Sequence, residues 1–292
     1  MSWLGLFVTT VSLPSAPISS TLANLLLVAG VAVLSMALRS CTNVVLQKLG
    51  ALGVLATSFL VGWLFTGYVI IGVLCASSWL MLPWLEILTR IRKLTLPTEK
   101  KLRHKHPPNQ EAFPALEGLT DEVERLGFVQ RDDTGWDWQD YAQFFRLFYK
   151  ESERSQAAIC LIDQHDVAFY YLSVSSRGQD GRIWTTWNYP FAYSLKLAPQ
   201  WQVNRVSADN SFMDLYDSHR DFLRRNGVIE PDLEPLDPDQ LQLEIQKDLA
   251  AQIQHNVAVG VLTPAGDGAV RYSWRGLLYI WVQFLRDLVR LS

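Results

Sequence analysis

The sequence contains long stretches without a charged side chain. No Asp, Glu, Lys or Arg occurs in the first 38 residues, and none occurs in the 37 residues from Leu49 to Leu85. An apolar run of 18 or more residues with few or no charges is expected to form a transmembrane helix. These absences therefore argue against a wholly soluble protein and predict an integral membrane protein.

Cysteine and the common catalytic motifs are also scarce. The three cysteines, Cys41, Cys75 and Cys160, show no CxxC spacing, so neither a disulfide framework nor a zinc site is expected. The five histidines do not form an HExxH pattern, and no P-loop, GxGxxG or GxSxG motif is present. The sequence thus predicts no metal and no cofactor.

The charges that are present divide the chain into two halves of opposite sign. Residues 1–106 hold nine basic and two acidic residues, a net charge of +7, whereas residues 107–292 hold 17 basic and 27 acidic residues, a net charge of −10. Binding to nucleic acid needs a basic face. The acidic half therefore argues against a nucleic-acid partner.

The first apolar core runs from Leu22 to Leu38 and is long enough for one spanning helix. No basic residue precedes it, so it is not expected to be a cleaved signal peptide. The second run allows two interpretations. It forms two helices joined by a tight turn at Gly67, which gives three spans, or it forms one span over Leu49–Leu74 followed by an interfacial segment over Ala76–Leu88, which gives two.

The distribution of basic residues predicts the orientation. A dense group from Arg90 to Lys105 follows the second run, and short loops rich in Lys and Arg stay on the cytoplasmic side. We therefore expect a multi-pass protein of the cell membrane, with residues 107–292 in the cytoplasm. The expected organisation is a transmembrane region over 1–95, a basic, Pro-containing linker over 96–114 and a soluble domain over 115–292.

The soluble part is expected to be an α+β domain. Segments rich in β-branched and aromatic residues, with Asp180-Gly181 before the third, predict an antiparallel meander extended by two further segments: Ala157–Ile162, Val167–Ser175, Arg182–Asn188, Tyr193–Lys196 and Trp201–Val206. A second hairpin is expected from Val257–Leu262 and Ala269–Tyr272. The segment Tyr141–Tyr149 fits one apolar helical face or a strand equally well.

Helices are predicted before and after the meander in the sequence. They cover Ala115–Leu126, Phe212–Arg225, a segment that begins at the N-cap Asp237, and the amphipathic Trp274–Leu291. The last helix packs on the sheet or lies in the membrane interface, and packing is the ordinary way to close an α+β core.

Three segments of this domain resemble a pattern found in an uncharacterised class of bacterial membrane-anchored hypothetical proteins. They are Asp180–Asn188, Leu215–His219 and Arg271–Gly276. The resemblance covers roughly residues 115–285. It implies a type of domain, and it carries no activity and no site residues.

The candidate site residues fall in three places. Asp163, His165 and Asp166 lie between two predicted strands, where the histidine suits a general base or a polar turn. His219 follows a helical Leu-Tyr pair and belongs to a polar site or to a helix surface. The third place holds Thr185, Thr186 and Asn188. These residues line a polar pocket or make ordinary cross-strand and turn contacts.

These weak motifs favour a binding function over catalysis. The leading hypothesis is a membrane-tethered cytoplasmic binding module or accessory subunit. Its partners are the lipid bilayer and another protein or a second copy, contacted through small residues of the spans (Ala29, Gly30, Gly53, Ala56 and Gly62). The alternative is a membrane-associated enzyme acting on a lipid or a membrane-derived substrate, with Asp163, His165 and Asp166 at its centre.

Overall fold

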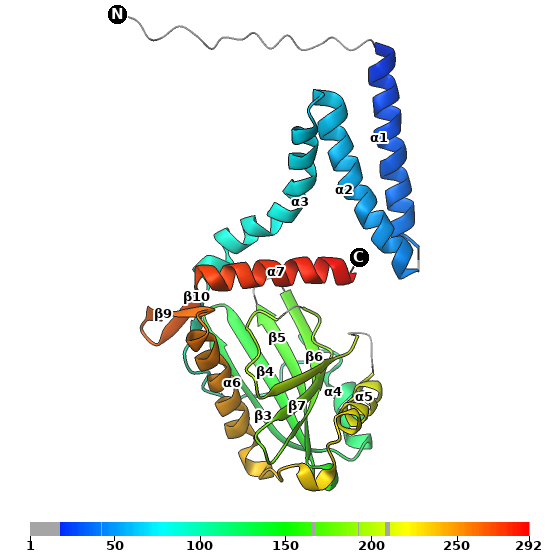
Figure 1. The fold of residues 1–292 in the computed structure, drawn as a ribbon. Coiled ribbons are helices and arrows are strands. Elements are labelled where there is room, and N and C mark those ends of the chain that lie inside the picture. The colour runs from blue at the N-terminus through cyan, green and yellow to red at the C-terminus, as the bar shows by residue number, and fades with distance from the viewer. Residues whose placement is uncertain (1–17, 42, 165–166, 192, 208–210, 292) are drawn as a thin grey trace, which may run out of the picture. The chain divides into compact units, whose positions relative to one another are not determined.

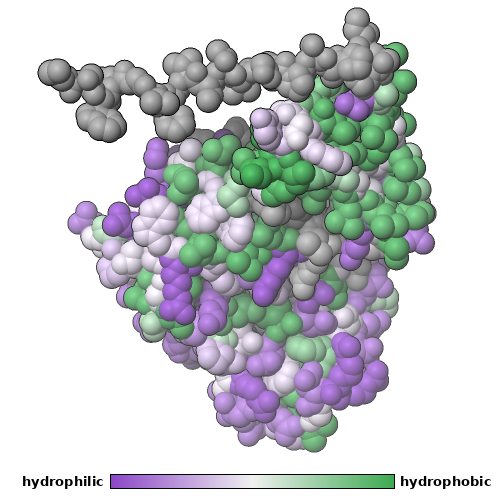
Figure 2. Space-filling model, turned by 45° about the horizontal axis from the view of Figure 1, so that its top comes forward, coloured by the Kyte–Doolittle hydropathy of each residue, from purple (hydrophilic) through white to green (hydrophobic). Residues whose placement is uncertain are grey.

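The computed structural model describes residues 18–41, 43–164, 167–191, 193–207 and 211–291. The described residues form two compact units, one within residues 1–85 and 285–292 and the other within residues 86–284 (Figure 1). In the space-filling view, hydrophobic residues dominate the surface of the apolar helices, whereas hydrophilic residues are frequent over the sheet unit (Figure 2).

The first unit contains the apolar helices. Helices α1 (Ile18–Arg39) and α2 (Val44–Thr66) are long and apolar enough to cross a membrane. Helix α3 (Val69–Thr89) is bent by 47° between residues 79 and 81, so it is either a broken span or a re-entrant segment. Two or three spans therefore both remain compatible with the fold. The turn between α2 and α3 lies at Gly67, in the left-handed conformation that glycine favours.

Glycines let the apolar helices approach each other closely. A Cβ atom at Gly53 of α2 would lie 2.2 Å from Ser35 Oγ of α1, and one at Gly62 of α2 would lie 2.7 Å from the carbonyl oxygen of Ile71 of α3. Asn24 of α1 also donates a hydrogen bond to the carbonyl of Leu64 in α2. Small residues thus allow close packing within this unit, as expected for membrane helices.

The second unit is an α+β domain built on a seven-stranded sheet. The strand order is β2-β3-β4-β5-β6-β7-β8, and every neighbouring pair is antiparallel except β7 and β8. The strands are β2 (Arg103–His104), β3 (Val129–Trp138), β4 (Tyr141–Lys150), β5 (Ser155–Gln164), β6 (Val167–Arg177), β7 (Ile183–Trp187) and β8 (Trp201–Arg205). The predicted α+β fold class, with apolar helices before a meander and flanking helices, is confirmed.

Helices cover both faces of this sheet. Phe144 and Phe148 of β4 face a core formed with α4 (Leu116–Arg125) and α5 (Phe212–Arg225). Phe145, Leu147 and Tyr149 of the same strand face the opposite core, which α6 (Leu241–Ala258) closes. Because side chains alternate between the faces of a strand, a strand buried on both sides is apolar along its length.

A smaller sheet has the order β1-β10-β9 and leads into the last helix. Its strands are β1 (Thr95–Pro97), β9 (Leu262–Gly266) and β10 (Ala269–Tyr272), and α7 (Trp274–Leu291) follows directly. Short 3-10 helices lie over Ile91–Lys93 (η1), Glu151–Glu153 (η2), Glu230–Asp232 (η3) and Pro238–Gln240 (η4).

Several sequence expectations need correction. Val257 and Ala258 are the last residues of α6, so the second hairpin starts at Leu262. The described part of Tyr193–Lys196 contains no strand. Strand β8 joins the sheet parallel to β7, because the chain returns after β7 to the end of the sheet at which β7 begins. The undecided segment Tyr141–Tyr149 is the central strand β4.

Candidate functional site: a basic pocket walled by tryptophan

The predicted site residues do not form one site. Asp163 lies exposed at the end of β5, where it pairs with Ala142 and Ala168. His165 and Asp166 lie outside the described residues. Asn188 is buried and accepts a 2.6 Å hydrogen bond from the backbone N–H of Leu172, so it supports the sheet backbone.

His219 and Thr186 come together inside the core that α5 closes. His219 is only 1% exposed, and its ring nitrogens lie 3.1 Å from Thr186 Oγ1 and 3.1 Å from Ser176 Oγ. Ser176 in turn lies 2.7 Å from Ser155 Oγ. Burial lowers the pKa of His219 to about 3, so the imidazole is neutral at physiological pH. This geometry describes a buried core histidine whose two ring nitrogens both have hydrogen-bond partners.

Thr185 points to the opposite face from Thr186, because neighbouring residues of a strand alternate. Its hydroxyl lies 2.8 Å from Ser175 Oγ, and both line a cavity of about 120 Å³ beneath α6. Trp187 and Trp201 line the same cavity. This volume is below the range of roughly 300–1,000 Å³ that is usual for ligand pockets, so the cavity is too small to be the main binding site.

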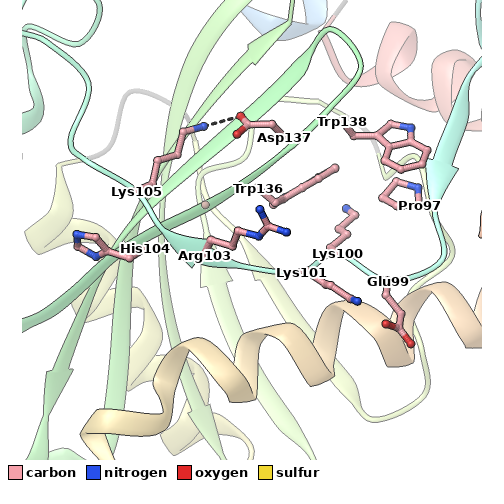
Figure 3. Close-up of a pocket in the computed structure, with 11 residues that line it drawn as sticks. Pro97, Glu99, Lys100, Lys101, Arg103, His104, Lys105, Trp136, Asp137 and Trp138 are labelled. Atoms are coloured by element: carbon pink, nitrogen blue, oxygen red, sulfur yellow. Dashed lines mark hydrogen bonds and ion pairs between the residues drawn. The ribbon is translucent and has the colours of Figure 1, made fainter.

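The larger cavity lies at the β2–β3 edge of the sheet and measures about 410 Å³. We call it the basic pocket. Its lining combines five basic side chains, two tryptophans, two acids, a proline and a glycine: Lys100, Lys101, Arg103, His104, Lys105, Trp136, Trp138, Glu99, Asp137, Pro97 and Gly135. Figure 3 shows Lys100 and Arg103 pointing toward Trp136, with Trp138 and Pro97 on one side.

The segment that carries these cations is held in place by the domain. Leu102 is buried among the core residues beneath α6, and its backbone N–H and carbonyl are hydrogen-bonded by the side chains of Gln246 and Gln242. On either side of this anchor, β1 pairs with β10 and β2 pairs with β3. The backbone that carries the basic residues is therefore held in place, which lowers the entropy cost of ordering this segment around a ligand.

The backbone approaches closely at Gly135, opposite Arg103. A Cβ atom at Gly135 would lie 2.2 Å from the carbonyl oxygen of Gln143 and 2.8 Å from Lys105 Cδ. Only glycine fits there without displacing one of these neighbours. The missing side chain at Gly135 thus leaves room for the Lys105 stem.

The tryptophan rings are oriented by hydrogen bonds. Trp136 Nε1 donates to Gln143 Oε1 at 3.0 Å, and Trp138 Nε1 donates to the carbonyl of Thr95 at 3.0 Å. Lys100 Nζ lies 4.5 Å from the Trp136 ring centre, a cation–π contact. The pocket thus places positive charge beside tryptophan rings that are held in fixed orientations.

Most of the positive charge in the pocket has no anionic partner in the part of the chain that the structure describes. Lys105 Nζ lies 2.6 Å from Asp137 Oδ1 and His104 Nδ1 lies 3.2 Å from Asp132 Oδ1. Within the described ranges, no carboxylate oxygen comes within 4.0 Å of the cationic nitrogens of the other three bases, Lys100, Lys101 and Arg103. Burial lowers the pKa of Lys100 to about 8, so this ammonium is costly to keep charged without an anion.

Sequence reasoning placed these cations at the end of a membrane helix and assigned them no pocket. The local signal in the sequence is the aromatic pair in Trp136-Asp137-Trp138. Trp136 is buried and Trp138 half-buried, and both line the pocket. Among the described residues there is no group of three His, Cys, Asp or Glu side chains that could hold a metal ion.

Comparison with known proteins adds no functional information. No protein-family model matches the chain, and neither the curated proteins nor the solved structures contain a significant match.

Proposed function

We propose that this protein is a membrane-tethered binding module whose basic pocket takes a phosphate-type anion. The observation that carries the proposal is a group of cations around Trp136 (Lys100, Lys101 and Arg103), which have no ion-pair partner within the described residues and line a cavity of about 410 Å³. Anionic oxygens would accept charge-assisted hydrogen bonds from Arg103 and the two lysines. The indole faces would pack against the apolar or planar part of the same ligand.

The charge of the surrounding domain supports a selective site. Residues 107–292 carry a net charge of −10, so an anion meets repulsion over most of this part of the chain. The pocket lining, with Lys100, Lys101, Arg103 and Lys105 against Glu99 and Asp137, has a net charge of +2 with histidine neutral. A local positive site within an acidic domain favours selective binding of one small anion. It disfavours non-specific binding of large polyanions.

The same cations support the cytoplasmic placement of the domain. Seven Lys and Arg residues lie between Arg90 and Lys105, against a single acid, Glu99. By the positive-inside rule this flank stays in the cytoplasm. The bound anion is accordingly a cytoplasmic phosphate compound or an anionic headgroup of the inner leaflet.

Calorimetric titration of pyrophosphate into the full chain in nanodiscs of neutral lipid tests the pocket. Replacing Arg103 by Gln removes one charge-assisted contact, worth about 1.5–3 kcal/mol, so we expect roughly 10- to 100-fold weaker binding. Arg224→Gln is the matched control, because Arg224 lies exposed on α5 and pairs with Asp221. Equal affinity of the two variants would refute the assignment.

A second arm separates soluble from lipid anions. Full chain in nanodiscs that contain phosphatidic acid is titrated with the same pyrophosphate. A lipid ligand predicts competition, so the apparent affinity for pyrophosphate falls relative to neutral discs, and this competition disappears in Arg103→Gln. Unchanged affinity indicates a soluble ligand. Absence of pyrophosphate binding in neutral discs, together with no Arg103-dependent retention of phosphatidic acid, would overturn the proposal.

The orientation is tested on intact cells with a membrane-impermeant maleimide. The probe is a cysteine in place of the exposed Glu111, in a chain whose Cys41 and Cys75 are replaced by alanine. We expect labelling only after lysis. Labelling of intact cells would contradict the cytoplasmic placement.

A further inference from the structure

Helix α7 carries apolar side chains on two faces, and only one of them is used by the domain. Leu277 and Ile280 are buried, and a Cβ atom at Gly276 would lie 2.1 Å from the carbonyl oxygen of Val261. Ser273 Oγ accepts from the N–H of Gly276 and so caps the helix. These contacts fix the first half of α7 against the rest of the domain.

The other face is an exposed apolar stripe formed by Trp274, Leu278 and Val282. These side chains are 60%, 51% and 39% exposed, and they follow each other at intervals of four residues, which places them on one side of the helix. At 100° per residue, Arg275 and Arg286 fall together along one border of the stripe, and both are exposed. A row of apolar residues bordered by arginines is typical of helices that lie in a membrane interface.

The start of the stripe lies close to the chain that leaves the last apolar helix. The Arg92 guanidinium carbon lies 4.8 Å from the Trp274 ring centre. Arg92 is three residues beyond Thr89, the last residue of α3, so their Cα atoms are at most about 11 Å apart. In addition, β1 pairs with β10, which ends two residues before Trp274. These short connections hold Trp274 near the end of an apolar helix through local contacts alone.

We infer that α7 docks on the surface of the bilayer through the Trp274–Leu278–Val282 stripe. The apolar side chains enter the boundary between headgroups and acyl chains, where tryptophan is favoured. The arginines along the border meet lipid phosphates. This contact is independent of the basic pocket, because none of the stripe residues lines it.

Site-directed spin labelling of the full chain, one copy per nanodisc, tests the inference. The label is placed at Leu278→Cys, with Cys41 and Cys75 replaced by alanine and the buried Cys160 retained. The matched control is Leu243→Cys on α6, another exposed leucine, with 45% exposure against 51%. Accessibility to oxygen, which partitions into lipid, is compared with accessibility to a water-soluble nickel chelate.

We expect the oxygen-to-nickel accessibility ratio to be higher at 278 than at 243, and to fall to the value at 243 when the protein is moved from nanodiscs to a detergent-free amphipathic polymer. Two results would overturn the inference. A label at 278 with the same nickel accessibility as the label at 243 shows that the stripe faces water. A label that neither reagent reaches shows that protein covers the stripe.

Discussion

The buried imidazole of His219 makes the stability of the domain sensitive to pH. Burial lowers its pKa from 6.5 to about 3 in the folded chain. Between these values the unfolded chain binds a proton that the folded chain does not. The contribution of His219 to stability is therefore complete above pH 6.5 and is lost progressively as the pH falls toward 3.

The size of the effect follows from the shift. Each pKa unit corresponds to 1.36 kcal/mol, so the full shift is worth about 5 kcal/mol, and about 2 kcal/mol of it is lost between pH 7 and pH 5. For a domain of this size, one kcal/mol changes the melting temperature by about 2–4 °C. We expect His219 to account for a fall of about 4–8 °C over this range.

Thermal unfolding of the full chain in detergent, at half-unit steps from pH 7 to pH 5, measures this slope. His219→Gln retains hydrogen-bonding capacity toward its neighbours Thr186 and Ser176 and removes the titrating group. Its melting temperature should be lower at pH 7, because packing is disturbed, but the drop between pH 7 and pH 5 should be smaller than in the unmodified chain.

Thr186→Val serves as the control, because it removes a hydrogen-bond partner of His219 and leaves the imidazole in place. It should lower stability and keep the pH slope. Other acids titrate identically in each variant, so they cancel in the comparison. If the unmodified chain and His219→Gln lose equal stability on acidification, the argument that burial keeps this histidine neutral is wrong.

Three further predictions concern other buried contacts. Arg146→Met leaves the buried Asp133 carboxylate without its bidentate partner, which should lower the free energy of unfolding by about 3–5 kcal/mol in a denaturant titration; a loss under 1 kcal/mol would contradict this. Because the pKa of Lys100 is about 8, pyrophosphate affinity of the unmodified chain should fall relative to that of Lys100→Gln as the pH rises through 8, whereas equal pH slopes would place this lysine outside the site. Gly53→Leu places a side chain where Ser35 lies, so disulfide cross-linking between cysteines on α1 and α2 should fall, and unchanged cross-linking would refute the close packing.

The central strands could be predicted only in part. Hairpins with an Asp-Gly turn are specified locally, and the β6–β7 turn with Gly181 at positive φ follows that rule. The segment Tyr141–Tyr149 was ambiguous, because β4 is buried on both faces and so lacks the alternation that identifies a strand. Its type is decided by pairing with β3 and β5, the strands that directly precede and follow it, and the segment's own pattern does not reveal this pairing.

The buried polar group around His219 shows a different limit. The sequence offered His219 and Thr186 as members of two separate candidate sites. They meet because α5 packs across β6 and β7, a contact between residues 33 positions apart that no local pattern encodes. From the sequence, polar residues such as His219 and Thr186 suggest a functional site. In the folded chain they are buried, and they form hydrogen bonds with neighbouring buried polar groups.

The basic flank carries two physical signals that overlap in sequence, and this overlap explains why the pocket was missed. A flank this rich in lysine and arginine is already explained by its effect on membrane orientation. A further role of the same residues in anion binding therefore cannot be recognised from the composition of the segment. The basic residues of the flank lie in two places: Arg90, Arg92 and Lys93 precede β1, whereas Lys100, Lys101, Arg103 and Lys105 line the pocket. Arg103→Gln therefore leaves six of the seven basic residues of the flank in place. We expect it to weaken anion binding without inverting the domain. A loss of binding accompanied by maleimide labelling of intact cells would instead assign this arginine to topology.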